Sequence, residues 1–452
     1  MGGRRNGVQG VSGRKNARKR SRETEPRSKP GGNISAAILQ PRYAAIILIA
    51  GIVEAARVIA QSAARWNLDD FSLHYTSALA LRTGADPYSS NLEPLGHPLG
   101  LVLGVLTRAT DTPFFLVVFE PLTMLSPYTA YWVWFALSAI ALTVTIMLLF
   151  REMPDLPLPV RIALIGLTLM YVPVAQNFLF SQSQTVILFL LTLAVIFMNR
   201  NRDEAAGAAI GLAVLMRGFP VFLIGYLAAT RRWRAAAASL ATIVAGGALT
   251  VAIAGVARPF SFIASAMPWI TQPAFWGQWY NISAGAFIAR LFYLCFGLAL
   301  DTPGFTAARA AAIVTEFGLI GIAIANALRR QARSDPDFRV FSLWIATTIV
   351  VSPTAWVHYM TLFILPFFLL TDAALKNRTS ERACWLAAAN WALVAFAAWF
   401  YMRNRLGMIP VWRAPGAGIF PPMAEASFLA FVAGYAALYW FATDESPNMG
   451  DE

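Results

Sequence analysis

The chain has 452 residues, of which 57% are hydrophobic and 13% are charged. A soluble protein of this length needs more charged surface, so the composition excludes a soluble globular protein and predicts a polytopic, all-α membrane protein. The formal net charge is +12, but residues 1–42 alone hold eleven Lys and Arg against Glu23 and Glu25. The basicity therefore belongs mostly to one tail, and no nucleic-acid partner is expected.

The tail at residues 1–42 contains too few apolar side chains to form a core, and we expect it to be disordered. Its densest run of positive charge extends from Arg14 to Arg20. Positive charge before a first membrane span is retained on the cytoplasmic side and also favours contact with anionic lipids. The sequence therefore predicts a cytoplasmic N-terminus and membrane lipids as partners.

Apolar runs follow the tail through most of the chain. A spanning helix needs roughly 17–20 apolar residues, and this criterion predicts about twelve transmembrane helices in a single domain at 43–443, followed by an acidic cytoplasmic tail at 444–452. The first span is an anchor and no cleavable signal peptide, because it lies beyond a long basic region. Pro127 and Pro353 end two of the shorter runs, which we expect to be broken spans. The expected spans lie near 44–60, 113–126, 128–150, 161–180, 183–199, 205–229, 235–256, 306–328, 340–352, 358–375, 384–402 and 424–443.

Basic clusters in short connections predict the orientation. The clusters that begin at Arg231, Arg329 and Lys376 are expected to be cytoplasmic. Two larger loops, at 61–112 and 257–305, then face outward, in a multi-pass protein of the cytoplasmic (plasma) membrane with both termini inside.

One basic pair conflicts with this topology. Twelve spans place Arg200 and Arg202 outside, against the positive-inside rule. An alternative breaks the helix between Arg217 and Pro220, and the sequence leaves both open.

An acidic pair, Asp69 and Asp70, stands directly after the first span. A carboxylate at a membrane boundary is costly unless it faces water, a partner or a substrate. Residues 71–81 are apolar at helical spacing, which predicts a short amphipathic helix along the interface, with the pair at its start. Carboxylates there can cap free N–H groups and stabilise the helix dipole. For Asp69 this capping role and a substrate role both stay open.

Cysteine and histidine patterns do not indicate a metal centre. Cys295 and Cys384 both lie in apolar runs, and the three histidines, His74, His97 and His358, are widely spaced. None of them forms a metal-ligand motif.

The stretch Asp70-Phe-Ser-Leu-His-Tyr75, followed by Gly84-Ala-Asp-Pro-Tyr88, resembles the first-loop motif of glycosyltransferase family 87. This family comprises polyprenyl-phosphate-mannose-dependent mannosyltransferases of the GT-C superfamily. The order of the matching motifs covers residues 70 to about 366. The further matches are Glu120-Pro-Leu122, Tyr131-Trp132, Ser181-Gln-Ser-Gln184, Gly211 to Pro220, Arg231 to Arg234, Asn281-Ile-Ser283 with Arg290, and Ser352 to Tyr359.

The chain departs from the family pattern at three points. Asp111-Thr-Pro113 stands where a Tyr-Pro-Pro stretch is usual, so this loop differs from the family pattern. Ser183-Gln184 replaces the usual Gly-Gln, and Arg217 replaces the commoner Lys while keeping the positive charge.

The resemblance implies a GT-C-like helical bundle that transfers a hexose, most simply mannose, from a polyprenyl-phosphate donor to a lipid or glycan acceptor at the outer face. Such a donor is already activated because its phosphate leaves without protonation, so the enzyme needs mainly a base for the acceptor hydroxyl. Asp70 matches the catalytic aspartate of the family. No cofactor is required on this reading, although Asp69 could bind either sugar hydroxyls or a divalent metal.

Several other matching residues are expected to bind substrate. Arg217 lies in an apolar run and should pair with a carboxylate, carbonyls or a phosphate, although it could instead extend to the interface. His358 could contact the donor phosphate or orient the acceptor, or it could be an ordinary buried histidine. The expected substrate-binding residues are Asp69, Tyr88, Gln184, Arg217, Asn281, Arg290 and His358.

A second class of function also fits the composition. Twelve spans with an intramembrane arginine suit a transporter or flippase of a lipid-linked or anionic solute. The sequence shows no inverted repeat, and the long first loop is unusual for such a carrier.

Overall fold

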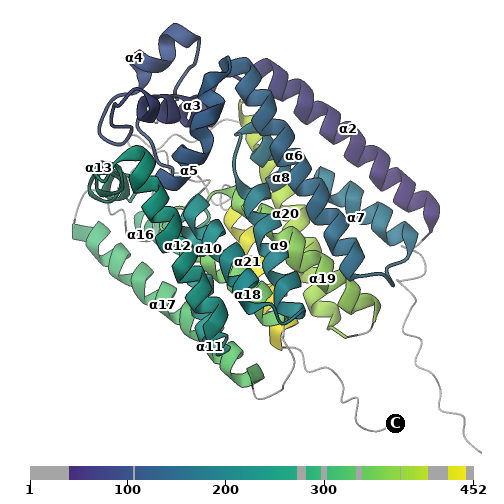
Figure 1. Ribbon diagram of the computed structural model, residues 1–452. Helices are drawn as coiled ribbons and strands as arrows, with labels where there is room; N and C mark the ends of the chain where they lie inside the picture. The colour runs from purple at the N-terminus through teal and green to yellow at the C-terminus, as the bar shows by residue number, and fades with distance from the viewer. Residues whose placement is uncertain are drawn as a thin grey trace, which may run out of the picture.

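The computed structural model describes residues 40–104, 107–271, 281–296, 303–331, 338–376, 378–405 and 426–443. These residues form a bundle of helices without a β-strand, which confirms the all-α prediction for this part of the chain (Figure 1). Residues 1–39 of the predicted basic tail at 1–42 and the whole predicted acidic tail at 444–452 lie outside the described residues. So do residues 272–280 and 297–302 of the predicted second outer loop at 257–305.

The helices follow one another with short connections. The first half of the bundle contains α2 (Pro41–Arg65), α3 (Asp69–Arg82), α4 (Glu93–Gly96), η1 (His97–Leu99), α5 (Pro113–Phe119), η2 (Glu120–Met124), α6 (Pro127–Glu152), α7 (Leu158–Met170), α8 (Val172–Leu179), α9 (Gln184–Asn199) and α10 (Asp203–Arg217). The second half contains η3 (Phe219–Val221), α11 (Phe222–Ala229), α12 (Trp233–Ala254), α13 (Ala257–Ser261), η4 (Phe262–Ala266), α14 (Met267–Ile270), α16 (Ala284–Phe296), α17 (Pro303–Gln331), α18 (Phe338–Val350), η5 (Val357–Phe363), α19 (Ile364–Leu375), α20 (Glu381–Arg405) and α21 (Ala426–Thr443).

Among the described residues, six helices are long and apolar enough to cross a membrane, or seven if a bent pair is one span. The predicted count of twelve is not reached, because several apolar runs fold as short or bent helices. The expected span at 161–180 consists of α7 and α8, which meet at 50°. The shorter apolar helices are Pro113–Met124, Gln184–Asn199, Phe219–Ala229 and Phe338–Val350.

The expected span at 205–229 is two helices. α10 ends at Arg217, Gly218 adopts a positive φ of 61°, and the chain continues as η3 and α11. Arg232, just after α11, forms a 2.6 Å ion pair with Asp203 at the start of α10. Both ends of this helical pair therefore lie at the same end of the bundle, and the break near Arg217 is the correct alternative.

This geometry also removes the conflict at Arg200. Arg200 bonds to Glu152 at 2.6 Å, and Lys376 lies 3.7 Å from Asp155. Together with the pair of Arg232 and Asp203, these contacts bring together the connections α6–α7, α9–α10, α11–α12 and α19–α20. We call this region, which contains Arg200, Arg232 and Lys376, the basic end. Basic residues that looked misplaced in the sequence thus lie beside the other clusters, because the chain turns back between α10 and α11.

The opposite end of the bundle carries α3 and the segments around it (Figure 1). The predicted helix is present, but the prediction that it is amphipathic is wrong, since residues 71–78 are all buried. Phe71 packs on Phe119 at 6.3 Å on one side. Leu73 packs with Leu92 and Leu103 on another. The loop that follows α3 folds back over it and hides the face that the sequence pattern assigned to solvent.

The two segments predicted to be outer loops meet at this end. Arg258 donates to the Gly84 carbonyl at 2.7 Å, and Ser261 donates to Asp86 Oδ2 at 2.5 Å. We call this region, opposite the basic end, the loop end.

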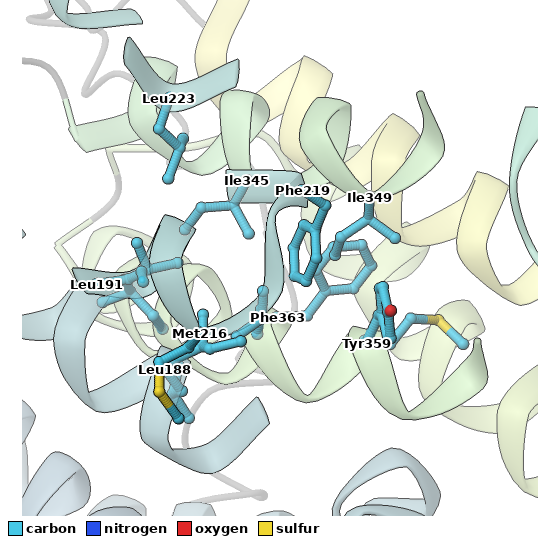
Figure 2. Packing of buried hydrophobic residues seen from close by; sticks show 14 of the residues in the cluster. Leu188, Leu191, Met216, Phe219, Leu223, Ile345, Ile349, Tyr359 and Phe363 are labelled. Carbon is cyan, nitrogen blue, oxygen red and sulfur yellow. The ribbon is translucent and has the colours of Figure 1, made fainter. Parts of the chain in front are cut away.

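A cluster of large apolar side chains fills the centre of the bundle (Figure 2). Met216 and Phe219 belong to it and flank the turn at Arg217 and Gly218. The Phe219 ring stacks on Tyr359 with ring centres 4.7 Å apart. Close packing on both sides therefore fixes the position of the turn, and with it the arginine.

Candidate active site

The Asp70 carboxylate lies at the loop end, in the first turn of α3. It is half-buried, and its Oδ2 accepts a hydrogen bond of 2.7 Å from Nε2 of Gln182. A carboxylate in the first turn of a helix is also stabilised by the helix dipole. The structure describes the backbone of Asp69 in the same turn, whereas its side chain lies outside the described part.

Gln182 is placed by the way in which α8 ends. Ser181 adopts a left-handed φ of 51°, and the Gln182 N–H donates to the Asn177 carbonyl at 2.8 Å. This pattern is a Schellman-type helix end, in which a left-handed residue reverses the chain. The indole N–H of Trp134 donates to the Ser181 carbonyl at 2.8 Å and holds the turn from the side.

Arg217 lies beside Gln182 and is largely buried, with an 11% exposed side chain. Its Nη2 donates to Gln182 Oε1, and its Nε donates to Ser183 Oγ at 3.2 Å. Its Nη1 lies 2.7 Å from Asp111 Oδ1. The sequence left open whether Arg217 pairs with a carboxylate or extends to the membrane interface. In the structure it pairs with the carboxylate of Asp111.

Asp111 is the counter-ion of this arginine, and sequence reasoning missed its role. Its fully buried Oδ2 lies 2.5 Å from Nδ1 of His74. Burial by itself raises the pKa of Asp111, but the charges of His74 and Arg217 and the His74 hydrogen bond outweigh it, so the pKa is lowered. In the sequence Asp111 was only a departure from a family motif, and no local pattern identified its partners.

Tyr88 and Asp86 support the Asp111 segment. The Tyr88 hydroxyl donates to the Asp111 carbonyl at 3.0 Å, and burial raises the pKa of this tyrosine well above its usual value. Burial also raises the pKa of Asp86, but hydrogen bonds from Ser261, Ser89 and the Tyr88 N–H lower it overall. The ionised Asp86 therefore fixes the loop that carries Tyr88, whose substrate-binding role stays a prediction.

His358 lies in η5 and is 5% exposed. Electrostatic interactions link it to Arg217 and His74. Its Nε2 and the Nε2 of His74 are both buried and lack a hydrogen-bond partner among the described residues. Buried polar atoms are normally paired, so these two imidazoles have bonding capacity that a substrate could use.

Asn281 and Arg290 hold a different part of the framework. Asn281 Oδ1 accepts from the N–H groups of Ser283 at 3.1 Å and Ala355 at 3.0 Å. Nη1 of the buried Arg290 donates to the Asn281 carbonyl at 3.0 Å. These bonds fasten the start of α16 to the segment that leads into η5 and His358, so the two residues contribute structure near the site.

Gln184 differs from Gln182. Its backbone N–H donates to Asn177 Oδ1 at 2.9 Å, and its side chain is completely buried. Neither amide atom of that side chain has a hydrogen-bond partner in the described part of the chain. Both glutamines belong to the matching motif, and Gln182 is the one that contacts Asp70. The substrate-binding role of Gln184 stays a prediction.

The site therefore combines a half-buried carboxylate, a neutral amide donor, a buried ion pair and two imidazoles. Such a set can accept a proton at Asp70 and place positive charge nearby, at Arg217. The described residues contain no group of three or more His, Cys, Asp or Glu side chains that could hold a metal ion.

Comparison with known proteins gives the family. The model of glycosyltransferase family 87 matches residues 110–353, which is more than half of the chain. The match includes Asp111, Gln182 and Arg217, whereas Asp70 and His358 lie outside it. No curated protein matches the chain. With its membrane-type helices and this family match, the chain belongs to glycosyltransferase family 87 and is a membrane glycosyltransferase.

Proposed function

We propose that this protein transfers a hexose, with mannose as the first candidate, from a polyprenyl-phosphate donor to a lipid or glycan acceptor. The proposal rests on the Asp70 carboxylate, which lies half-buried at the loop end and is oriented by Gln182 beside Arg217. Family membership supports glycosyl transfer as the reaction. The polyprenyl-phosphate donor, the identity of the sugar and Asp70 as the base are proposed in addition to this reaction.

Asp70 acts as the general base. It takes the proton from an acceptor hydroxyl as that oxygen attacks the anomeric carbon of the sugar. The bond between this carbon and the phosphate oxygen breaks, and polyprenyl phosphate leaves with the electron pair. Because this leaving group needs no protonation, a single carboxylate can carry the proton transfer.

The phosphate of the donor is bound by positive charge and hydrogen-bond donors that lie in the same region as Asp70. Arg217 and His358 are the candidates, since both are buried near Asp111 and His74 and the Nε2 of His358 has no partner among the described residues. The N–H bonds of Arg217 that do not point to protein partners remain for a substrate oxygen. Further substrate contacts are assigned to Asp69, Tyr88, Gln184, Asn281 and Arg290, and the reaction is proposed to need no cofactor.

We assign the basic end to the cytoplasm, because Lys and Arg are enriched in cytoplasmic connections. The loop end then faces outward from the cytoplasmic membrane, where a lipid-linked donor and acceptor can both reach Asp70, and both termini are cytoplasmic. The bundle is proposed to be GT-C-like, with α9 and α18, which are shorter and apolar, as candidates for further membrane-crossing segments.

The test is transfer by purified protein in lipid. Labelled polyprenyl-phosphate sugars that differ in the sugar are incubated with wild type and with Asp70→Asn. We expect turnover with one donor, mannose first, and loss of turnover in the variant by roughly 100- to 10,000-fold, the contribution of a general base. Unchanged turnover in Asp70→Asn removes Asp70 as the base. Movement of the intact labelled lipid across the membrane of vesicles, without transfer of its sugar, would instead favour the transporter alternative.

A further inference from the structure

The amide of Gln182 joins two charged groups of opposite sign. Its Nε2 donates to Asp70 Oδ2 at 2.7 Å, and its Oε1 accepts from Arg217 Nη2. A carboxylate only accepts and a guanidinium only donates, so the two partners permit a single orientation of the amide. Gln182 is thus fixed in rotamer and in direction.

The backbone of Gln182 is fixed as well. Ser181 before it is in the left-handed region, which costs a non-glycine residue about 1 kcal/mol or more. Trp134 and Asn177 bond to the turn and offset that cost. Strain of this kind persists where the surroundings require one geometry, and it is concentrated at functional sites.

Other charged groups face the same region. Arg217 and Tyr359 both interact electrostatically with Asp70, and Arg217 also interacts with Asp111. His74 and His358 complete the set. Asp111 forms the ion pair with Arg217. The hydrogen-bonded link between Arg217 and Asp70 runs through the neutral amide of Gln182.

We propose that Gln182 is a positioning residue, which aims the Asp70 carboxylate at the acceptor hydroxyl and couples it to Arg217 through a neutral bridge. This inference rests on the proposed role of Asp70 and adds a residue that acts through Asp70. A neutral donor can hold a carboxylate in place while leaving it able to accept a proton, whereas a direct bidentate arginine pair occupies both of its oxygens. Loss of the bridge therefore misplaces the base, and the Schellman-type turn is the structural device that prevents it.

The experiment uses the full-length protein in lipid, three single variants, and Asp70→Asn as a reference and as a second background. Gln182→Met keeps the length and volume of the side chain and removes both hydrogen bonds. Gln182→Glu keeps an acceptor for Arg217 and places a second carboxylate beside Asp70. The matched control is Gln61→Ala on α2, because Gln61 accepts a bond of 2.7 Å from Arg57, away from the site.

The first readout is the pH profile of transfer. We expect Gln182→Met to lower kcat about 10- to 100-fold with little change in KM, since misplacing a catalytic group by about 1 Å has an effect of this size. Gln182→Glu should move the acidic limb to higher pH, because a like charge disfavours the ionised base. In an Asp70→Asn background, Gln182→Met should add no further loss, as coupled residues are not additive.

The second readout needs no activity. Infrared difference spectra, with Asp70→Asn as reference, isolate the carboxylate band of Asp70 during a pH titration. We expect Gln182→Met to shift the band and move its titration midpoint to higher pH, because a hydrogen bond to the charged form is lost.

The outcomes separate the two claims. If wild type transfers no sugar but the band responds to Gln182→Met, the proposed function is wrong and the positioning of Asp70 by Gln182 stands. If wild type is active while kcat, pH profile and band are all unchanged in Gln182→Met and Gln182→Glu, the inference is overturned. Any parallel change in Gln61→Ala would also overturn it, since the hydrogen bond of that side chain is to Arg57 on the same helix.

Discussion

The carboxylate of Asp111 lies 2.7 Å from the guanidinium of Arg217, and the same carboxylate is bonded to His74. Three helices, α3, α5 and α10, therefore meet at one buried charge cluster, with Asp111 just before α5. Arg217 of this cluster bonds to Gln182, which in turn bonds to Asp70. The geometry of the proposed catalytic centre therefore depends on the cluster.

Replacing Asp111 with Asn should strongly destabilise the protein. The change leaves the buried Arg217 without its counter-ion, and breaking one side of such a pair costs about 3–5 kcal/mol. The free energy of unfolding in detergent measures it. Asp155→Asn is the control, because Asp155 is 76% exposed beside Lys376 and should change stability by only about 0–1 kcal/mol. Equal effects of the two variants would contradict a buried, paired Asp111.

The lowered pKa of Asp111 predicts the direction in which the stability of the folded protein changes with pH. Its folded-state pKa lies below the ordinary value of 3.8, so its contribution to stability is complete above that pH and is lost as the pH falls through the folded pKa. The difference in Tm between wild type and Asp111→Asn should be largest near neutral pH and shrink on acidification below 3.8. A difference that grows on acidification would contradict this assignment.

Gly218→Ala should destabilise the turn after Arg217. Nothing lies within 4 Å of the added Cβ, so the cost comes from the positive φ of 61° alone, about 1–2 kcal/mol. Gly247→Ala is the control. Its Cβ also meets open space, but Gly247 is in the middle of α12, where alanine is favoured by about 0.5–1 kcal/mol. Thermal unfolding of both should give shifts of opposite sign, and equal shifts would contradict the backbone explanation.

Asp86→Asn should loosen the contact between the two loop segments. The neutral amide is a weaker acceptor for Ser261, Ser89 and the Tyr88 N–H, and a typical hydrogen bond contributes about 0.5–1.5 kcal/mol. Hydrogen exchange in α13 and η4 should become faster. Ser261→Ala removes one of these bonds and should give a smaller effect in the same region. Unchanged exchange in both variants would contradict a role for Asp86 in joining the segments.

Local sequence patterns predicted a large part of the fold. Apolar runs and prolines located the helices, and the Gly218-Phe-Pro220 stretch offered the break that the structure contains. The pattern misled at α3, whose helical spacing was read as amphipathic. Periodicity records which residues are apolar, but it cannot record that a later loop folds back over a polar face and buries Ser72, His74, Thr76 and Ser77.

The site was predicted in outline and completed by packing. Asp70, Arg217 and His358 were identified from the sequence, and the structure brings them into one region. Asp111 and Gln182 received no role, because each gains its partners from segments far away in the chain. A motif placed Gln184 in the site, but the left-handed Ser181 decides which of the two neighbouring glutamines faces Asp70.

By itself, the sequence determined that this protein is helical, lies in the membrane and carries a carboxylate at the start of a helix after the first span. These properties depend on hydrophobicity and on the local preferences of the backbone, which short stretches encode directly. Only the tertiary structure decided that Arg217 pairs with Asp111 and reaches Asp70 through Gln182. Such contacts join distant segments, and their geometry exists only once the bundle has packed and excluded water from these charges.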